Sequence, residues 1–345
     1  MKPNHLIKSV TLATGLALLA TLPANAGSHG KKPTPQNFIL ATASTGGTYY
    51  PVGVAIATLT KVKLQPKKKI GMSAINSAGS GENVRLLREN EAQFAILQGL
   101  FGHYAATGTG PVKADGPQKK LRAVTMLWQN VEQFVIAAKY VKTGTVSDLA
   151  GLKGQAMAMG KKNSGTIGSN RTLLKELGVD IDKDYKLVYG GYGPSANAVQ
   201  NGKAAGMGTP SGVPGGAVTK LFAAAKGKVK MLSFTPEQAK KADGGKGLWT
   251  PYTIKAGTYP GQDKDVNTIA QPNFLATNAD VNEEAVYLIT KTIYENLPFL
   301  NAIHKATKAM AVEKAIAGLP VPLHAGAARY YKEVGIKVPE ALMAK

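Results

Sequence analysis

The chain of 345 residues contains no cysteine. This absence excludes a disulfide framework, a thiol nucleophile, zinc sites built on thiolates and a lipid anchor attached to an N-terminal cysteine. The G-x-S-x-G, H-E-x-x-H and strand-following G-x-G-x-x-G patterns of common enzymes are also missing. Gly160–Thr166 has the spacing of a phosphate loop, but Thr166 stands where lysine should be. We therefore expect a protein that is not an enzyme and that needs no metal and no cofactor.

Acidic residues are scarce, with 21 Asp and Glu against 42 Lys and Arg, so the formal net charge is +21. A balance of this kind raises the question of nucleic-acid binding. However, the densest lysine clusters, Lys67–Lys69 and Lys119–Lys120, have no aromatic residues between them. We expect no nucleic acid as a partner, and instead a basic field that favours anionic ligands and negatively charged membrane surfaces.

Long apolar runs are absent except for a short one near the N-terminus. Lys2 and Lys8 precede the apolar block Leu16–Ala20, which is followed by the A-x-A pattern of Ala24–Ala26. A basic start, a short apolar block and small residues at the end are typical of a secretory signal peptide. The sequence predicts a periplasmic protein with a signal peptide over residues 1–26, cleaved after Ala26, and a flexible leader over residues 27–37.

The rest of the chain alternates between short apolar strands and helices, which indicates a largely parallel α/β sheet. A mature chain of this length also favours two domains. Strands are expected at 38–42, 70–75, 94–98, 122–128, 132–138, 155–159, 185–189 and 268–277, and helices at 49–60, 82–91, 194–200, 283–296 and 301–317 and from the loop after residue 160 to Leu177. Residues 206–216 are rich in Gly and Pro, and residues 243–262 are expected to be irregular.

Three apolar strands end in a Ser/Thr/Gly loop that begins a helix, at Ser44–Thr48, Ser77–Gly81 and Asn163–Thr166. The first N–H groups of a helix lack partners and carry partial positive charge. Such a helix end binds a carboxylate or phosphate without arginine. Each loop alone is also consistent with ordinary helix capping. Together they predict a cleft that binds an anion at the carboxyl edges of the strands.

The loops and several other segments resemble the TAXI family of extracytoplasmic solute receptors, the binding components of one branch of TRAP transporters. The segments that carry this resemblance are Ser44–Pro51, Gly79–Asn83, Asp148–Gly154, Asn163–Thr166, Ala256–Gly261, Leu323–Ala327 and Tyr330–Glu333.

The resemblance implies a type II periplasmic-binding-protein fold, in which two α/β lobes are joined by hinge strands and the ligand lies in the cleft between them. Residues 38–134 and 266–345 then form lobe I, and residues 135–265 form lobe II. The implied ligand is a small anion or zwitterion such as glutamate, glutamine or 2-oxoglutarate, and the implied partners are integral-membrane TRAP permease subunits. The implied mechanism is capture by domain closure.

From the loops and the resemblance together we expect ligand contacts from both lobes, with Trp128 or Tyr192 as an aromatic wall. The expected ligand-binding residues are Ser44, Gly47, Thr48, Tyr50, Ser80, Asn83, Gln98, Asn163, Ser164, Gly165, Thr166 and Ser211. Three alternatives remain open: a receptor for an ABC importer, with a ligand such as a sulfonate or pyrimidine, a sensory accessory protein, and a periplasmic enzyme on the same fold.

Overall fold

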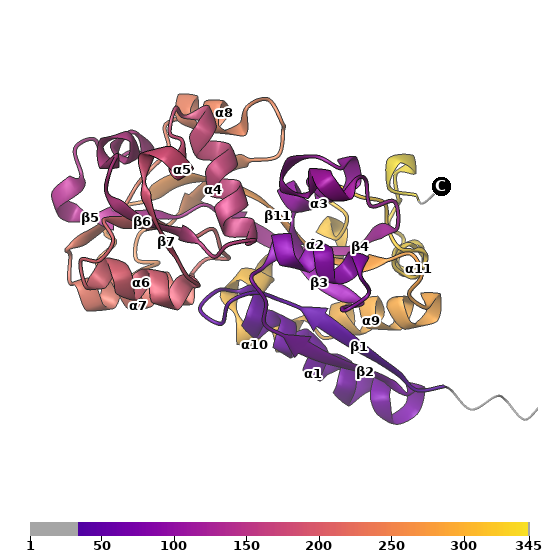
Figure 1. Ribbon diagram of the computed structural model, residues 1–345. Coiled ribbons are helices and arrows are strands. Elements are labelled where there is room, and N and C mark those ends of the chain that lie inside the picture. The colour runs from indigo at the N-terminus through magenta and orange to yellow at the C-terminus, as the bar shows by residue number, and fades with distance from the viewer. Residues whose placement is uncertain (1–33, 344–345) are drawn as a thin grey trace, which may run out of the picture. The chain divides into compact units, whose positions relative to one another are not determined.

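The computed structural model describes residues 34–343 and contains two β-sheets, each covered by helices (Figure 1). The predicted signal peptide, its cleavage site after Ala26 and most of the leader lie outside these residues. No helix within residues 34–343 has the length and apolar character needed to cross a bilayer.

The first sheet has six strands. Its parallel part consists of β1 (Gln36–Ala41), β2 (Ile70–Ile75) and β3 (Phe94–Gln98), with β1 in the middle. The long strand β11 (Val266–Asn278) runs antiparallel to β3 and also pairs with β4 (Leu121–Val131) and β10 (Thr250–Ile254). The carboxyl ends of β1 and β3 therefore point to the same edge of the sheet, where the predicted loops lie.

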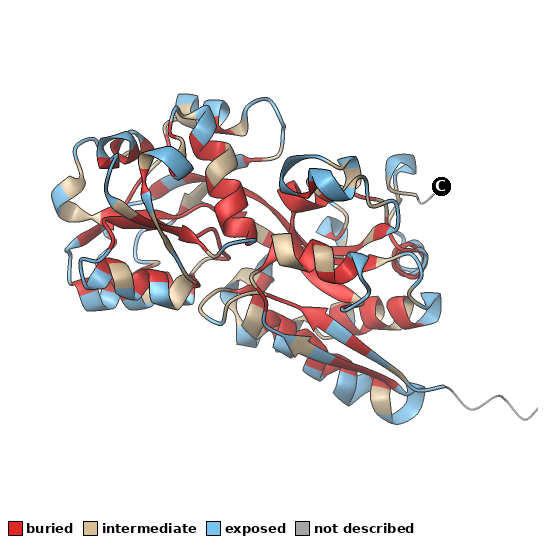
Figure 2. Ribbon diagram, viewed as in Figure 1, coloured by how far each residue is buried: buried red, intermediate tan, exposed pale blue. Residues whose placement is uncertain are grey.

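The second sheet has five strands in the order β7-β6-β8-β5-β9. β6 (Ala156–Gly160) pairs in parallel with β7 (Lys186–Tyr189) and β8 (Gly206–Gly208), and β5 (Phe134–Ala137) runs antiparallel to β8 and β9 (Val229–Met231). The strands of both sheets are largely buried (Figure 2).

Helices pack on both faces of the sheets and bury three apolar clusters, one in the first sheet and two around the second. The helices of the first sheet are α1 (Tyr49–Lys68), α2 (Ser80–Arg88), α3 (Gly99–Thr107), α9 (Glu283–Glu295), α10 (Leu297–Ile303) and α11 (Ala325–Glu333). Those of the second are α4 (Gly165–Glu176), α5 (Ile181–Asp184), α6 (Tyr192–Gln200), α7 (Gly216–Ala225) and α8 (Pro236–Asp243).

Two segments carry the chain from one sheet to the other. The first is the connection between β4 and β5, where Val131 belongs to a core of the second sheet while most of β4 packs in the first. The second is β11, whose Ile269 packs with the second sheet and whose Phe274–Ala276 pack with the first. The exact lobe boundaries at residues 134/135 and 265/266 stay a prediction.

Some sequence-based expectations for individual elements are wrong. α1 continues eight residues beyond Thr60, through Pro66, to the left-handed Lys69. Residues 243–262 are not irregular throughout, because β10 lies among them. The helix expected at 301–317 is replaced by the end of α10 and two short 3-10 turns, because His304 has an extended backbone and its ring accepts from the N–H of Ala306.

The glycine-rich stretch after residue 205 conceals a central strand, β8. A Cβ at Gly206 would lie 2.7 Å from the side chain of Ile136, and one at Gly208 would lie 2.6 Å from Asn170 Nδ2. Crowding in the sheet therefore requires glycine here, and these residues look like a turn in the sequence although they form a strand.

Candidate functional site

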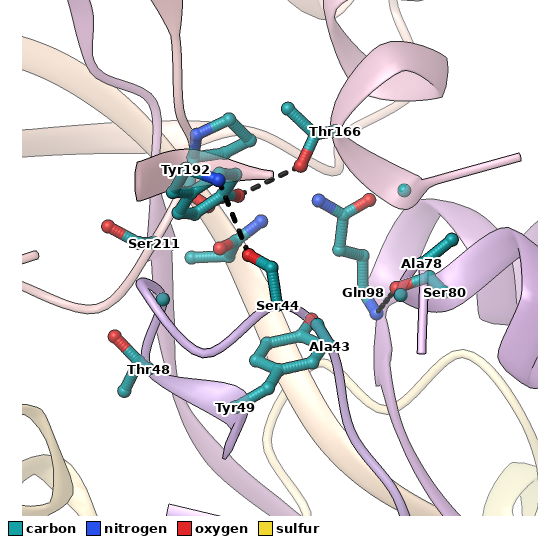
Figure 3. Close-up of a pocket in the computed structure, with 15 residues that line it drawn as sticks. Ala43, Ser44, Thr48, Tyr49, Ala78, Ser80, Gln98, Thr166, Tyr192 and Ser211 are labelled. Carbon is teal, nitrogen blue, oxygen red and sulfur yellow. Dashed lines mark hydrogen bonds between the residues drawn. The ribbon is translucent and has the colours of Figure 1, made fainter. Parts of the chain in front are cut away.

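Helix starts from both sheets converge on one cavity (Figure 3). α1, α2 and α3 begin there from the first sheet, and α4 and α6 begin there from the second. The cavity is narrow, with a volume of about 30 Å³. It is lined by Ala43, Ser44, Gly47, Thr48, Tyr49, Ala78, Gly79, Ser80, Gln98, Asn130, Gly165, Thr166, Tyr192, Pro210 and Ser211.

The structure brings eight of the twelve predicted contact residues together around this cavity. They are Ser44, Gly47, Thr48, Ser80, Gln98, Gly165, Thr166 and Ser211. The other four, Tyr50, Asn83, Asn163 and Ser164, are not among the lining residues.

Three of these four have structural roles instead. Asn83 is fully buried, and its Nδ2 donates to the carbonyls of Thr42 and Ile96 at 2.8 and 2.9 Å, so it ties β1 to β3. Ser164 is the N-cap of α4 and accepts from the N–H of Ile167 at 3.1 Å. The carbonyl of Asn163 accepts from the N–H of Glu82 at 3.0 Å.

Three backbone donors at the starts of α2 and α4 have no partner in the part of the chain that the structure describes. The N–H groups of Ser80, Gly165 and Thr166 donate no hydrogen bond within residues 34–343. Gly79, the N-cap of α2, has φ 109°, which favours glycine, and it supplies no side-chain cap. These donors and the aligned helix dipoles make the cavity favourable for a negatively charged group.

Two buried side-chain amides face the same space without partners. Gln98 is 3% exposed and Asn130 is 1% exposed, and neither side chain makes a hydrogen bond within the described chain. Figure 3 shows Gln98 extending from the end of β3 toward Thr166. An unpaired buried amide costs on the order of 1–3 kcal/mol, so a ligand or water that pairs with it gains that much.

Two tyrosines form the aromatic walls. Tyr192 OH donates to the carbonyl of Pro210 and therefore accepts from Thr166 Oγ1 at 2.8 Å, so the Thr166 hydroxyl is already engaged. Tyr49 OH donates to Asn273 Oδ1. Burial raises the pKa of both phenols above the usual value, so both are neutral at ordinary pH. Of the two aromatic walls considered, Tyr192 lines the cavity, whereas Trp128 is a core residue at 1% exposure.

No side chain that lines the cavity carries a charge. His304 is not a lining residue but contacts the wall, with its Nε2 3.4 Å from Thr48 Oγ1. Burial lowers the pKa of His304, so its ring is neutral at pH 7. The site therefore attracts an anion through backbone dipoles and not through a salt bridge.

The two lobes are in direct contact around the cavity, and glycines permit it. The N–H of Ala217 donates to the carbonyl of Gly46 at 3.2 Å across the gap. A Cβ at Gly81 would lie 2.4 Å from the carbonyl oxygen of Asn163, and one at Gly165 would lie 2.7 Å from Gln98 Oε1. Since real Cβ atoms do not approach so closely, glycine at these positions is required for the lobes to meet.

The sequence analysis did not predict Tyr49 or Asn130 as residues of the site. It considered three helix starts, whereas five meet at the cavity. The start of α6 had a visible signal, because Gly190-Gly191 precedes Pro194, a residue favoured in a first helical turn. Asn130 had none, because a polar residue near the end of a predicted strand is usually solvated.

Known structures with similar folds include periplasmic binding proteins. The periplasmic binding protein BugD aligns with a TM-score of 0.51 and 15% identity, over 87% of this chain and 94% of that chain. A protein from Bordetella bronchiseptica RB50 aligns with a TM-score of 0.50 and 13% identity, over 88% and 90%. The alkanesulfonate-binding protein SsuA from Xanthomonas axonopodis pv. citri, bound to MOPS, aligns with a TM-score of 0.47 and 12% identity, over 87% and 91%.

The similarity to BugD confirms the predicted α/β fold of a periplasmic binding protein, with two sheets that are both covered by helices. The sequence also matches a known protein family, the NMT1-like family, over residues 40–335. On this match, the chain belongs to the NMT1-like family.

Proposed function

We propose that this protein is a periplasmic solute-binding receptor that captures one small anion between its lobes, and that it is not an enzyme. The observation that supports this most strongly is the set of unpartnered donors at a cavity without charged side chains. The N–H groups of Ser80, Gly165 and Thr166 lie beside the unpartnered amides of Gln98 and Asn130. Thr48 contacts His304, but His304 Nδ1 accepts from the N–H of Ala306, so the neutral ring carries its proton on Nε2 and cannot take one from the Thr48 hydroxyl. Binding is therefore the chemistry that the lining residues support.

Capture then occurs by closure of the two lobes. Donors from α2 belong to one lobe and donors from α4 to the other, so an anion that contacts both stabilises the conformation in which they meet. The connection between β4 and β5 and the strand β11 serve as the hinge. A cavity of about 30 Å³ has room for one or two water molecules. The lobes must therefore part for a ligand to enter, and the lining side chains must move aside when the lobes close on it.

The ligand class and the transporter are the finer parts of the proposal. The TAXI-like motifs favour glutamate, glutamine or 2-oxoglutarate and a TRAP permease. The family match is also compatible with a receptor that serves an ABC importer or a sensory partner. The comparisons support this alternative better than they support a TRAP receptor. A sulfonate, the class named for SsuA, would satisfy the same helix ends.

A thermal-shift screen of the refolded, ligand-free protein tests the proposed function. A ligand that binds only the folded state raises the apparent stability by RT ln(1 + [L]/Kd), about 2.7 kcal/mol at 100 times Kd. Carboxylates, amino acids and sulfonates should include a compound that raises the melting temperature, and uncharged analogues of the same size should not. A screen in which only neutral compounds stabilise the protein would refute anion capture.

Replacing Gln98 by leucine is expected to separate binding from folding. The substitution removes an unpaired buried amide, so the free energy of unfolding should stay the same or rise. The affinity for the ligand should fall by about tenfold, the equivalent of about 1.4 kcal/mol for a lost hydrogen bond. Calorimetry and urea unfolding of the same preparation measure both quantities.

The control for this variant is Gln93→Leu, because Gln93 directly precedes β3, at the opposite end from Gln98, and does not line the cavity. Its affinity should equal that of the wild type. If Gln98→Leu binds as tightly as the control, Gln98 does not contact the ligand.

A further inference from the structure

Glu132 is a buried carboxyl group in the connection between the lobes. It is 1% exposed and follows Asn130, a residue of the cavity wall, by two positions. Its N–H donates to the carbonyl of Ile269 at 2.9 Å, and its carbonyl accepts from Thr268 Oγ1 at 2.7 Å. Both partners belong to β11, so Glu132 is fixed where the two hinge segments pair.

The carboxyl group is incompletely satisfied. Its Oε1 accepts from Trp249 Nε1 at 3.0 Å, but its Oε2 has no partner. Gln271, which pairs with Asn130 in the sheet, also has an unpartnered Nε2. Within residues 34–343 no Lys, Arg or His forms an ion pair with Glu132. A buried carboxylate without a counter-charge is unfavourable, whereas a protonated carboxyl group is not.

A negative charge on Glu132 acts electrostatically on two residues that line the cavity. The titratable groups whose pKa responds to it are the phenols of Tyr49, at the start of α1, and Tyr192, at the start of α6. Trp249, which precedes β10, and Gln271 of β11 are neutral. Thus a negative charge on Glu132 acts on the same small volume in which the proposed anion would sit.

We propose that Glu132 takes up one proton when an anion enters the cavity, so that the ligand is bound together with a proton. This inference rests on the proposed function. Two negative charges in one desolvated region repel each other, and the Glu132 carboxylate can relieve the repulsion by accepting a proton from the solution. The neutral carboxyl group still accepts from Trp249 through Oε1, and its new O–H on Oε2 supplies a donor.

The pKa of the Glu132 carboxyl group makes this proton uptake measurable near neutral pH. Burial, opposed mainly by the hydrogen bond from Trp249, raises the pKa of Glu132 to about 7. Above that pH the free protein carries the charge, and an anion raises the pKa further. Affinity for an anion should therefore fall as the pH rises above 7, by at most about tenfold per pH unit, since one proton is linked to binding.

Calorimetric titrations at pH 7.5 in two buffers with different ionisation enthalpies test this inference. The probes are 2-oxoglutarate, L-glutamate and methanesulfonate, none of which changes its own charge appreciably between pH 6 and 8.5. The wild type should take up a substantial fraction of one proton per ligand, and Glu132→Gln should take up none while still binding. Glu237→Gln, at an exposed glutamate on α8, is the matched control and should keep the wild-type uptake.

Each outcome decides between the proposals. Binding without proton uptake by the wild type, or equal uptake by Glu132→Gln, overturns the role of Glu132 and leaves anion capture intact. Failure of all three probes to bind refutes the proposed anion classes, and the inference falls with them. Should Glu132→Gln not fold, the pH dependence of wild-type affinity from pH 6 to 8.5 decides, because a flat profile contradicts linked protonation. His304→Asn removes the histidine that contacts Thr48 and should leave the uptake unchanged.

Discussion

Replacing Gly81 by alanine is expected to weaken ligand binding by about 100-fold without lowering the stability of the fold. The added Cβ would lie 2.4 Å from the carbonyl oxygen of Asn163 on the opposite lobe, so the lobes cannot reach their contact distance. Overpacking of this kind costs about 1–3 kcal/mol, and 1.4 kcal/mol corresponds to tenfold in affinity. In the open conformation the methyl group would lose its contact with Asn163 and keep only the ring edge of Phe101, at 3.3 Å. Alanine also favours the helix α2 by roughly 0.5–1 kcal/mol.

Gly193 provides a matched control for this prediction. It lies in the first turn of α6 next to the cavity residue Tyr192, and a Cβ there would meet nothing within 4 Å. Gly193→Ala should therefore bind with wild-type affinity. Titration calorimetry compares the variants, and urea unfolding confirms that both are folded. An affinity of Gly81→Ala equal to that of Gly193→Ala would show that binding does not need the lobes to meet here.

The stability of the wild type should fall as the pH rises from about 4.5 to 8, by about 3 kcal/mol more than that of Glu132→Gln. Burial raises the pKa of Glu132 to about 7 from 4.5, so between these values the folded state binds more protons than the unfolded state. The contribution of the protonated group to stability is complete below pH 4.5 and is lost as the pH rises through 7. A shift of this size, at 1.36 kcal/mol per pKa unit, gives the expected difference.

Urea unfolding of both proteins at pH 5 and pH 8 measures this effect, because all other titrating groups are shared and cancel in the comparison. Glu237→Gln serves again as the control, since Glu237 is exposed and hydrogen bonds lower its pKa. Parallel stability profiles of the wild type and Glu132→Gln would mean that Glu132 is charged or hydrated at neutral pH.

The sequence predicted the strands well where an apolar run ends in a turn. β1, β2, β3 and β11 lie within two residues of the expected ranges. It failed where tertiary contacts override the local pattern. β8 requires glycine at 206 and 208 because a Cβ there would collide with its neighbours, and a glycine-rich segment offers no periodic signal for a strand.

The site was predictable in outline because helix N-termini at parallel strand ends meet at one edge. That rule brought Ser44, Ser80 and Thr166 to one cavity. It could not distinguish a residue that faces the cavity from one that faces the core. Gln98 at the end of β3 and Asn83 in the first turn of α2 are both buried amides, yet Asn83 satisfies its donors with backbone carbonyls and the Gln98 amide has no partner.

Glu132 illustrates the same limit for electrostatics. In the sequence it stands among apolar and polar residues of an expected strand and looks like an ordinary surface acid. Its burial arises from the pairing of the β4–β5 connection with β11, residues more than a hundred positions apart. Only the three-dimensional arrangement therefore reveals an uncompensated carboxyl group beside the cavity.

The most direct test of anion capture is a calorimetric comparison of a carboxylate with its methyl ester. The anion that stabilises the wild type most and each of its monomethyl esters are titrated separately into the protein at pH 6.5. If the helix starts at Ser80 and Gly165 hold a carboxylate, one ester should bind at least about 100-fold more weakly, since a charge-assisted hydrogen bond contributes about 1.5–3 kcal/mol and more than one is lost. Esters that all bind as tightly as the parent acid would contradict the account.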